Sequence, residues 1–171
     1  MPGLDDDTDR LLVRLLAGDG RATLAALAAE AGLSVSAVQA RVRRLEARGV
    51  ITGYAAAVDH DALGLPLAAF VAITPLDPAQ PDDAPQRLVD LAAVEACYSV
   101  AGEDHYLLLV RAASPRALEG LLQEIRARAN VATRTTVVLQ TFFERRPPAA
   151  PGRADDTDPD DAGTDVAEHV G

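Results

Sequence analysis

The sequence predicts an α+β fold in which an N-terminal helix-turn-helix domain precedes a ferredoxin-like βαββαβ domain, and two patterns carry this prediction. Residues 6–48 contain three short stretches with apolar side chains at helical spacing, separated by turns that contain glycine. From residue 67 onwards, short apolar runs typical of buried strands alternate with two helical stretches. We therefore expect four parts: a helical domain at 1–54, a linker at 55–66, a ferredoxin-like domain at 67–146 and a tail at 147–171.

The first two predicted helices are short and begin with residues that favour helix N-termini. Leucines at positions 11, 12, 15 and 16 give residues 6–17 one apolar face, and the aspartates before them suit the positive end of a helix dipole. Gly18-Asp19-Gly20 should end this helix with residues that tolerate positive φ. Thr23 is the predicted N-cap of the second helix, which should end at Gly32. Its inward residues would be Leu24, Leu27, Ala28 and Ala31.

A third helix is predicted from Ser34 to Arg48, with Val38, Val42 and Leu45 as its buried stripe. The second helix, the glycine-containing turn and this helix form a helix-turn-helix pattern. The residues on its outward face would be Ser36, Gln39, Ala40 and Arg43. Hydroxyl, amide and guanidinium groups in such a position can pair with base edges in the major groove of DNA.

Residues 34–48 also carry four arginines and a single glutamate, a local formal charge of +3. We expect base contacts from Ser36, Gln39 and Arg43. The residues expected to contact phosphates or to support the helix are Ser34, Arg41, Arg44 and Arg48. Two other interpretations stay open at this point: a charged helix face that is merely solvated, and a three-helix domain that binds no DNA.

The second domain is predicted from two β-α-β units in succession. Strands are expected at Leu67–Thr74, Val94–Val100, Tyr106–Ala112 and Val131–Phe143. One helix should begin near Pro85, with Leu88, Leu91 and Ala92 as its inner face. The other should begin after the Ser114-Pro115 cap and end at Asn130, with an inner face of Leu118, Leu121, Leu122 and Ile125. Because one helical layer covers only one sheet face, a second copy of the chain is the simplest cover for the other.

The charge of the chain is unevenly distributed. All 16 basic residues are arginines, and the formal net charge is −10. Residues 147–171 hold one arginine and seven acidic residues, a charge of −6 that leaves −4 for residues 1–146. Four prolines and few large apolar residues predict that this tail is disordered. It would be either a solvated appendage or a segment that screens the DNA-binding surface.

Several classes of protein and of site are disfavoured by composition. The single cysteine, Cys97, which we expect to be a small buried apolar residue, forbids an intrachain disulfide and a cysteine-based zinc site. No apolar run is long enough for a membrane span, and the acidic start of the chain lacks the features of a secretory signal. We therefore expect a cytoplasmic protein without a membrane partner, metal or cofactor.

Motifs in both domains resemble the Lrp/AsnC (feast/famine) family of transcription regulators over residues 4–143. The matching residues in the helical domain include acids before Leu11-Leu12, then Gly20-Arg21, Gly32-Leu33-Ser34, Arg44-Leu45-Glu46 and Gly49-Val50-Ile51. Those in the linker and second domain include Val58-Asp59, Leu63-Gly64, Gly102-Glu103, Tyr106-Leu107-Leu108 and Thr133-Arg134-Thr135. The motifs occur in the family's order and at its spacing.

The resemblance implies a homodimer that assembles into tetramers, octamers or larger forms and binds double-stranded DNA at a pseudo-palindromic operator. It also implies a small effector, such as an amino acid, bound between subunits. The residues assigned to this effector are Gly102, Glu103, Asp104, His105 and Tyr106. One departure stands out, because the family often has an aspartate where this chain has His105. Since neighbouring strand residues point to opposite faces, Asp104 need not replace that acid.

The leading hypothesis is therefore a transcriptional regulator rather than an enzyme. Two alternatives differ from it in class. A tetrapyrrole decarboxylase of the siroheme type shares this two-domain architecture, but it would need basic residues lining a pocket, for which only His105 is a candidate. A sensing and assembly protein whose DNA-binding face has lapsed is disfavoured by the local charge of +3 on the third helix.

Overall fold

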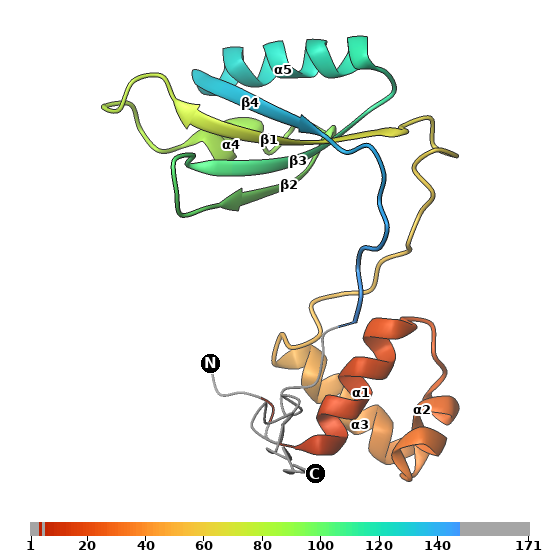
Figure 1. The fold of residues 1–171 in the computed structure, drawn as a ribbon. Helices are drawn as coiled ribbons and strands as arrows, with labels where there is room; N and C mark the ends of the chain where they lie inside the picture. The colour runs from red at the N-terminus through yellow and green to blue at the C-terminus, as the bar shows by residue number, and fades with distance from the viewer. Residues whose placement is uncertain (1–3, 5, 148–171) are drawn as a thin grey trace, which may run out of the picture. The chain divides into compact units, whose positions relative to one another are not determined.

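The computed structural model describes residue 4 and residues 6–147, and the chain divides into two compact units. Ala56–Glu144 forms the sheet unit, and the residues up to Ala55 belong to the helical unit (Figure 1). The predicted acidic tail lies almost entirely outside the described residues. In the part of the chain that the structure describes, no helix is both long and apolar enough to cross a membrane.

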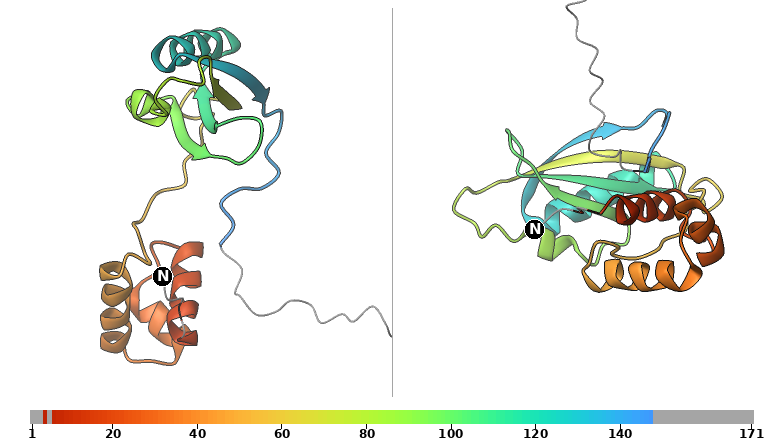
Figure 2. Two further views of the ribbon diagram at one scale, coloured as in Figure 1. Left: turned by 90° about the vertical axis from the view of Figure 1, so that its left-hand side faces the viewer. Right: turned by 90° about the horizontal axis from the view of Figure 1, so that it is seen from below.

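The helical unit contains the three predicted helices, α1 (Asp7–Gly18), α2 (Leu24–Ala31) and α3 (Val35–Ala47), packed together as Figure 2 shows. Side-chain caps begin each one: Asp6 accepts hydrogen bonds from the N–H groups of Thr8 and Asp9, Thr23 from that of Ala26, and Ser34 from that of Ala37. The buried residues shared by the three helices are Leu12, Leu27, Ala28, Val38 and Val42. Leu45 is also fully buried.

The ends of α1 and α2 differ. Gly32, with φ of 64°, ends α2 in the left-handed conformation expected of a glycine cap. By contrast, α1 ends at the predicted Gly18-Asp19-Gly20 turn, but Asp19 follows it with an extended backbone (φ −139°) rather than a left-handed one. The Asp19 N–H still donates to the Leu15 carbonyl at 2.8 Å, and its side chain accepts from the Arg21 N–H. These two hydrogen bonds end α1 and give partners to the Leu15 carbonyl and the Arg21 N–H without a left-handed residue.

The sheet unit has the predicted ferredoxin-like order. Its strands are β1 (Leu67–Pro75), β2 (Val94–Ser99), β3 (Tyr106–Ala112) and β4 (Val131–Val137), and its helices are α4 (Ala84–Leu88) and α5 (Pro115–Ala129). The strands pair antiparallel in the order β2-β3-β1-β4. Both helices lie on one face of the sheet (Figures 1 and 2). The core between them includes Val71, Ile73, Leu108, Val110, Leu88 and Ile125.

Two elements are shorter in the structure than the sequence predicts. The fourth strand ends at Val137 rather than Phe143. Val137 lies opposite Ala69 of β1, and the Val138 N–H donates one further hydrogen bond to the Ala68 carbonyl at 2.9 Å. The helix near Pro85 ends at Leu88. Tight turns then follow, which bury Leu91 and leave Ala92 exposed, so Ala92 does not belong to the inner face.

Cys97 also differs from the prediction: it is exposed, whereas a buried apolar residue was expected. It lies opposite Leu108 in the β2–β3 register, but β2 is an outermost strand of the sheet. The sulfur is partly covered, and this burial raises the pKa of the thiol.

The predicted linker is tied to the sheet at His60, to which the sequence assigned no role. The imidazole Nε2 lies 3.2 Å from Glu95 Oε1 on β2, and the other oxygen of Glu95 lies 3.2 Å from Arg111 Nε on β3. His60 is only 13% exposed in its side chain. The turn that contains His60 therefore packs on the sheet unit.

Candidate nucleic-acid interface and effector loop

The outward face of α3 carries the polar residues that the sequence assigned to it. Ser36, Ala40 and Arg43 are exposed, and Gln39 is half-buried. Ser34 is exposed at the N-cap, where its Oγ accepts from the Ala37 N–H at 3.2 Å and lies 3.1 Å from the Ser36 Oγ. The two hydroxyl groups thus sit together at the start of α3, the end from which a recognition helix contacts base edges.

The three arginines of α3 and Arg48, its C-cap, fall into two pairs with different surroundings. Arg41 and Arg44 contact carboxylates of the α1 segment: the Arg41 Nη1 donates to Asp6 Oδ2 at 2.6 Å and to Asp9 Oδ1 at 2.7 Å. The Arg44 Nη2 donates to Asp9 Oδ2 at 2.8 Å. Arg43 and Arg48 are exposed, and within residue 4 and residues 6–147 their side chains form no hydrogen bond or ion pair.

These contacts change the ionisation of the groups that make them. The Arg41 guanidinium lowers the pKa of Asp6 to about 2, helped by the backbone N–H groups that Asp6 caps. In return, the two carboxylates raise the pKa of Arg41. Asp9 is the buried member of the group, with only 2% of its surface exposed. Neither Asp6 nor Asp9 was predicted as a site residue, although the i, i+3 spacing of the two acids matches that of Arg41 and Arg44.

Of the predicted effector residues, Gly102 to His105 lie in the loop that joins β2 to β3 and Tyr106 begins β3, and their side chains have different surroundings. Gly102 has φ of 145°, a conformation that favours glycine. Tyr106 is buried in the core and its hydroxyl donates to Asp82 Oδ1 at 2.8 Å, a bond that raises the pKa of the tyrosine. His105 is exposed, and its backbone N–H donates to the Ile73 carbonyl.

Two acids of this loop remain near its surface. Asp104 forms an ion pair with Arg134 on β4 and accepts a hydrogen bond from the Thr74 hydroxyl at 3.4 Å. Glu103 is exposed, and its side chain has no partner among the described residues. The loop therefore offers one free carboxylate and one that is already paired with a guanidinium group.

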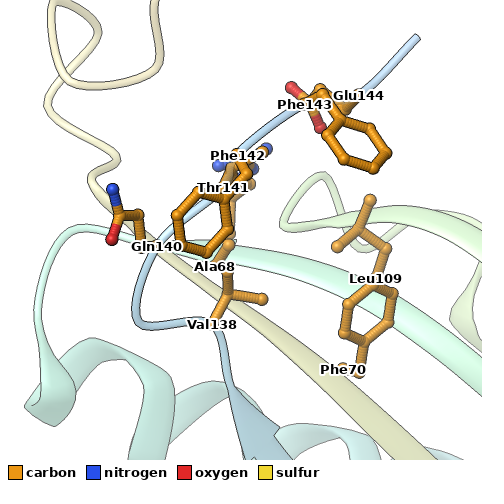
Figure 3. A pocket seen from close by; sticks show the side chains of 10 residues that line it. Ala68, Phe70, Leu109, Val138, Gln140, Thr141, Phe142, Phe143 and Glu144 are labelled. Atoms are coloured by element: carbon orange, nitrogen blue, oxygen red, sulfur yellow. The ribbon is translucent and has the colours of Figure 1, made fainter. Parts of the chain in front are cut away.

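A separate hollow of about 310 Å³ lies on the sheet face opposite the helices, under the segment that follows β4 (Figure 3). Phe70 and Leu109 come from the sheet, and Phe142 and Phe143 from the segment. None of the predicted effector residues lines this hollow. The described part of the chain also contains no cluster of three or more His, Cys, Asp or Glu residues that could hold a metal ion.

Comparisons with known proteins agree across both units. Residues 5–52 match the winged helix-turn-helix DNA-binding family, and residues 68–148 match the Lrp/AsnC ligand binding domain. The chain is 67% identical to the HTH-type transcriptional regulator LrpA of Mycobacterium tuberculosis, over 82% of this chain and 94% of the relative. The chain belongs to the Lrp/AsnC family.

Two further comparisons concern other regulators. The leucine-responsive regulatory protein of Escherichia coli is 37% identical over 81% of this chain and 88% of its own. A solved structure of the feast or famine regulatory protein of M. tuberculosis, complexed with L-methionine, superimposes with a TM-score of 0.82 at 66% identity, and the match covers 84% of this chain and 99% of that one. This Lrp/AsnC protein is a DNA-binding transcriptional regulator, not an enzyme, and nothing favours the decarboxylase alternative.

Proposed function

We propose that this Lrp/AsnC regulator reads its operator with the outward face of α3, within a DNA-binding domain at residues 1–54. The observation that carries the proposal is Arg43, an exposed guanidinium group without an intramolecular partner among the described residues, in the middle of a helix whose domain matches a DNA-binding family. Ser36 and Gln39 are its expected companions at base edges, and Arg48 is the expected phosphate contact. Ser34 supports the start of the helix as its cap.

The test is a pull-down of genomic fragments by the purified protein at low salt, repeated with each amino acid. We expect a small set of enriched fragments that share a pseudo-palindromic sequence, with half-sites about one DNA turn, or a multiple of it, apart. Binding should weaken steeply as salt rises, because counterions are released from the phosphates. Uniform recovery of all fragments, or recovery of none, would contradict sequence-specific regulation by this domain.

A zwitterionic amino acid is the proposed effector, bound by the sheet domain at residues 67–146. The M. tuberculosis relative whose structure contains L-methionine supports this class of ligand. The Asp104–Arg134 pair offers one carboxylate and one guanidinium group, which match the ammonium and carboxylate groups of an amino acid. Glu103, two positions before His105, supplies a second negative charge. The family often has an aspartate at the position of His105, so Glu103 lies near the place of that missing acid in the chain.

L-methionine is the first ligand to test, by calorimetry on the full-length protein. We expect Asp104→Asn to weaken binding at least tenfold, as the loss of a charged hydrogen bond of about 1.5–3 kcal/mol implies. Glu119→Gln, a matched change at an exposed acid of α5, should bind as the wild type does. Equal affinity of the Asp104→Asn and wild-type proteins for methionine would remove Asp104 from the site.

A homodimer formed through the uncovered sheet face is the proposed assembly unit, from which larger oligomers are built. This face presents Ala68, Phe70, Ala72, Leu107 and Leu109. Phe70 is 39% exposed there, and Phe142 and Phe143 beside the hollow are 81% and 66% exposed. Burying such a face against its own copy by a two-fold axis is the commonest route to a symmetric oligomer.

A regulator of this kind would act in the cytoplasm, with residues 55–66 as the linker between its domains.

A further inference from the structure

The acids at the start of α1 and the arginines of α3 form a compact group that we call the α1–α3 clamp: Asp6, Asp9, Arg41 and Arg44. All four side chains are joined by three hydrogen-bonded ion pairs of 2.6–2.8 Å. The residues of each ion pair are more than thirty positions apart in the chain, so the clamp is a tertiary contact. Two positive and two negative charges make it formally neutral.

Asp9 is the centre of the clamp. Its side chain is 3% exposed, and each of its oxygens accepts from a different arginine. A carboxylate buried to this degree is tolerated only when it is paired and hydrogen-bonded. Asp9 therefore fixes the rotamers of both arginines, and with them one face of α3, against α1.

Asp6 has two roles at once. One oxygen, Oδ1, accepts from the N–H groups of Thr8 and Asp9 and so caps α1, while Oδ2 accepts from Arg41. Because the capping residue also binds α3, the start of α1 and the recognition helix are held in one geometry. Asp7, between the two clamp acids in the chain, points elsewhere and pairs only with Arg10 among the described residues, with 96% of its side chain exposed.

We propose that Asp6 and Asp9 are positioning residues for DNA recognition, which retain Arg41 and Arg44 in the clamp and leave Arg43 of α3 and Arg48 at its C-cap as the arginines that meet DNA. This inference rests on the proposed DNA contact by α3. The +3 charge of residues 34–48 is then only partly available to DNA, because the carboxylates of Asp6 and Asp9 neutralise Arg41 and Arg44. The clamp thereby limits attraction to any phosphate backbone and keeps binding dependent on base contacts.

The salt dependence of DNA binding measures this division directly, because each arginine that contacts a phosphate adds about 0.9 to the slope of log K against log salt. Asp9→Asn should release Arg44 and steepen the slope for non-specific DNA by about one. It should also lower the ratio of specific to non-specific affinity. Asp7→Asn is the matched control, since it removes the same charge from the same helix but breaks no contact to α3, and its slope should equal that of the wild type.

A second pair of variants avoids any risk that Asp9→Asn fails to fold. Arg44→Ala, which leaves Asp9 paired with Arg41, should keep the wild-type slope, whereas Arg48→Ala should reduce it by about one. A merely structural clamp would alter stability and the active fraction but leave the slope of Asp9→Asn equal to that of the wild type.

The outcomes separate the inference from the function on which it rests. Failure of the wild-type protein to bind any specific fragment would overturn the proposed function. Specific binding by the wild type, combined with a slope reduced by Arg44→Ala as much as by Arg48→Ala, would overturn the clamp alone. So would equal slopes for Asp9→Asn and Asp7→Asn.

Discussion

Arg43 is the residue on which recognition by this protein should depend most. Its exposed side chain has no intramolecular contact within residue 4 and residues 6–147, so its removal should leave the free energy of unfolding nearly unchanged. We expect Arg43→Ala to weaken operator binding by about 1–3 kcal/mol and to relax the preference at one base pair. Titration of a labelled operator and of single-base variants measures both effects. Arg116→Ala, at an exposed arginine of α5, is the control, and operator affinity equal in the two variants would exclude Arg43 from base contact.

The lowered pKa of Asp6 predicts how the stability of the fold changes in acid. Its pKa is about 2 in the folded protein against an ordinary value of 3.8, so the charged form stabilises the fold at neutral pH. That contribution is fully present above about pH 4 and is lost as the pH falls toward about pH 2. Asp6→Asn keeps an effective helix cap but cannot carry the charge. The difference in Tm between wild type and Asp6→Asn should therefore be constant from neutral pH to about pH 4 and shrink below it. A difference that persists unchanged at about pH 2 would show that the ion pair with Arg41 is not its cause.

Single residues also show what sequence alone can and cannot predict. Thr23 as a cap and Val38 as a core residue were predicted and confirmed, because caps and helical stripes are local patterns within a few positions. The partners of Arg41 were not predictable in this way, since Asp6 and Asp9 lie more than thirty positions away. The same applies to Asp104, whose partner Arg134 is thirty positions further along. The role of each predicted DNA and effector residue stays a prediction.

At the scale of elements, two glycines should respond in opposite directions to the same substitution. Gly32 ends α2 at φ of 64° with open space around it, so Gly32→Ala should cost only the backbone strain, about 1–2 kcal/mol. Gly120 lies within α5, where an added methyl group would also meet open space, and Gly120→Ala should stabilise by roughly 0.5–1 kcal/mol. Native-state hydrogen exchange read by mass spectrometry can follow α2 and α5 separately. Stabilisation by Gly32→Ala would mean that the turn before α3 does not need its left-handed residue.

The boundaries of elements were harder to predict than their existence. The apolar and β-branched run at 131–143 reads as one strand, yet β4 stops at Val137, opposite Ala69, although β1 extends to Leu67. Strand propensity alone therefore did not locate the end of the strand. The residues beyond it pass over the outer face of the sheet, where Phe142 and Phe143 border the hollow (Figure 3). Cys97 was misplaced for a related reason, because edge and central strands have the same local pattern.

At the scale of the whole molecule, the net charge of −10 does not argue against a DNA-binding function. Residues 147–171 account for −6 of it and belong to neither predicted folded domain. Within the helical unit, the clamp further neutralises two arginines, and Arg43 and Arg48 form no ion pair with the described residues. We therefore expect attraction to DNA in general to be weak for each subunit, and the proposed dimer to gain its affinity by binding one operator with two subunits.

The proposed dimer can be tested by placing a charge on the uncovered sheet face. Phe70→Asp would bury an unpaired carboxylate in the interface, so we expect this variant to dissociate at concentrations where the wild type remains associated. Val89→Asp is the control, because Val89 is a 76% exposed apolar residue at the end of α4, on the helical side of the sheet. Sedimentation equilibrium gives the mass of each, and circular dichroism checks that both are folded.

The same variants link assembly to DNA binding. When two half-sites are bound by one dimer, the second contact forms at high effective concentration, which can raise affinity about 10²–10⁴-fold over a single contact. Phe70→Asp should lose operator affinity by a factor in that range, although Phe70 is not in the predicted DNA-binding domain. Its affinity for an isolated half-site should match that of Val89→Asp. A folded Phe70→Asp protein with the wild-type mass and wild-type operator affinity would place the dimer interface on another surface.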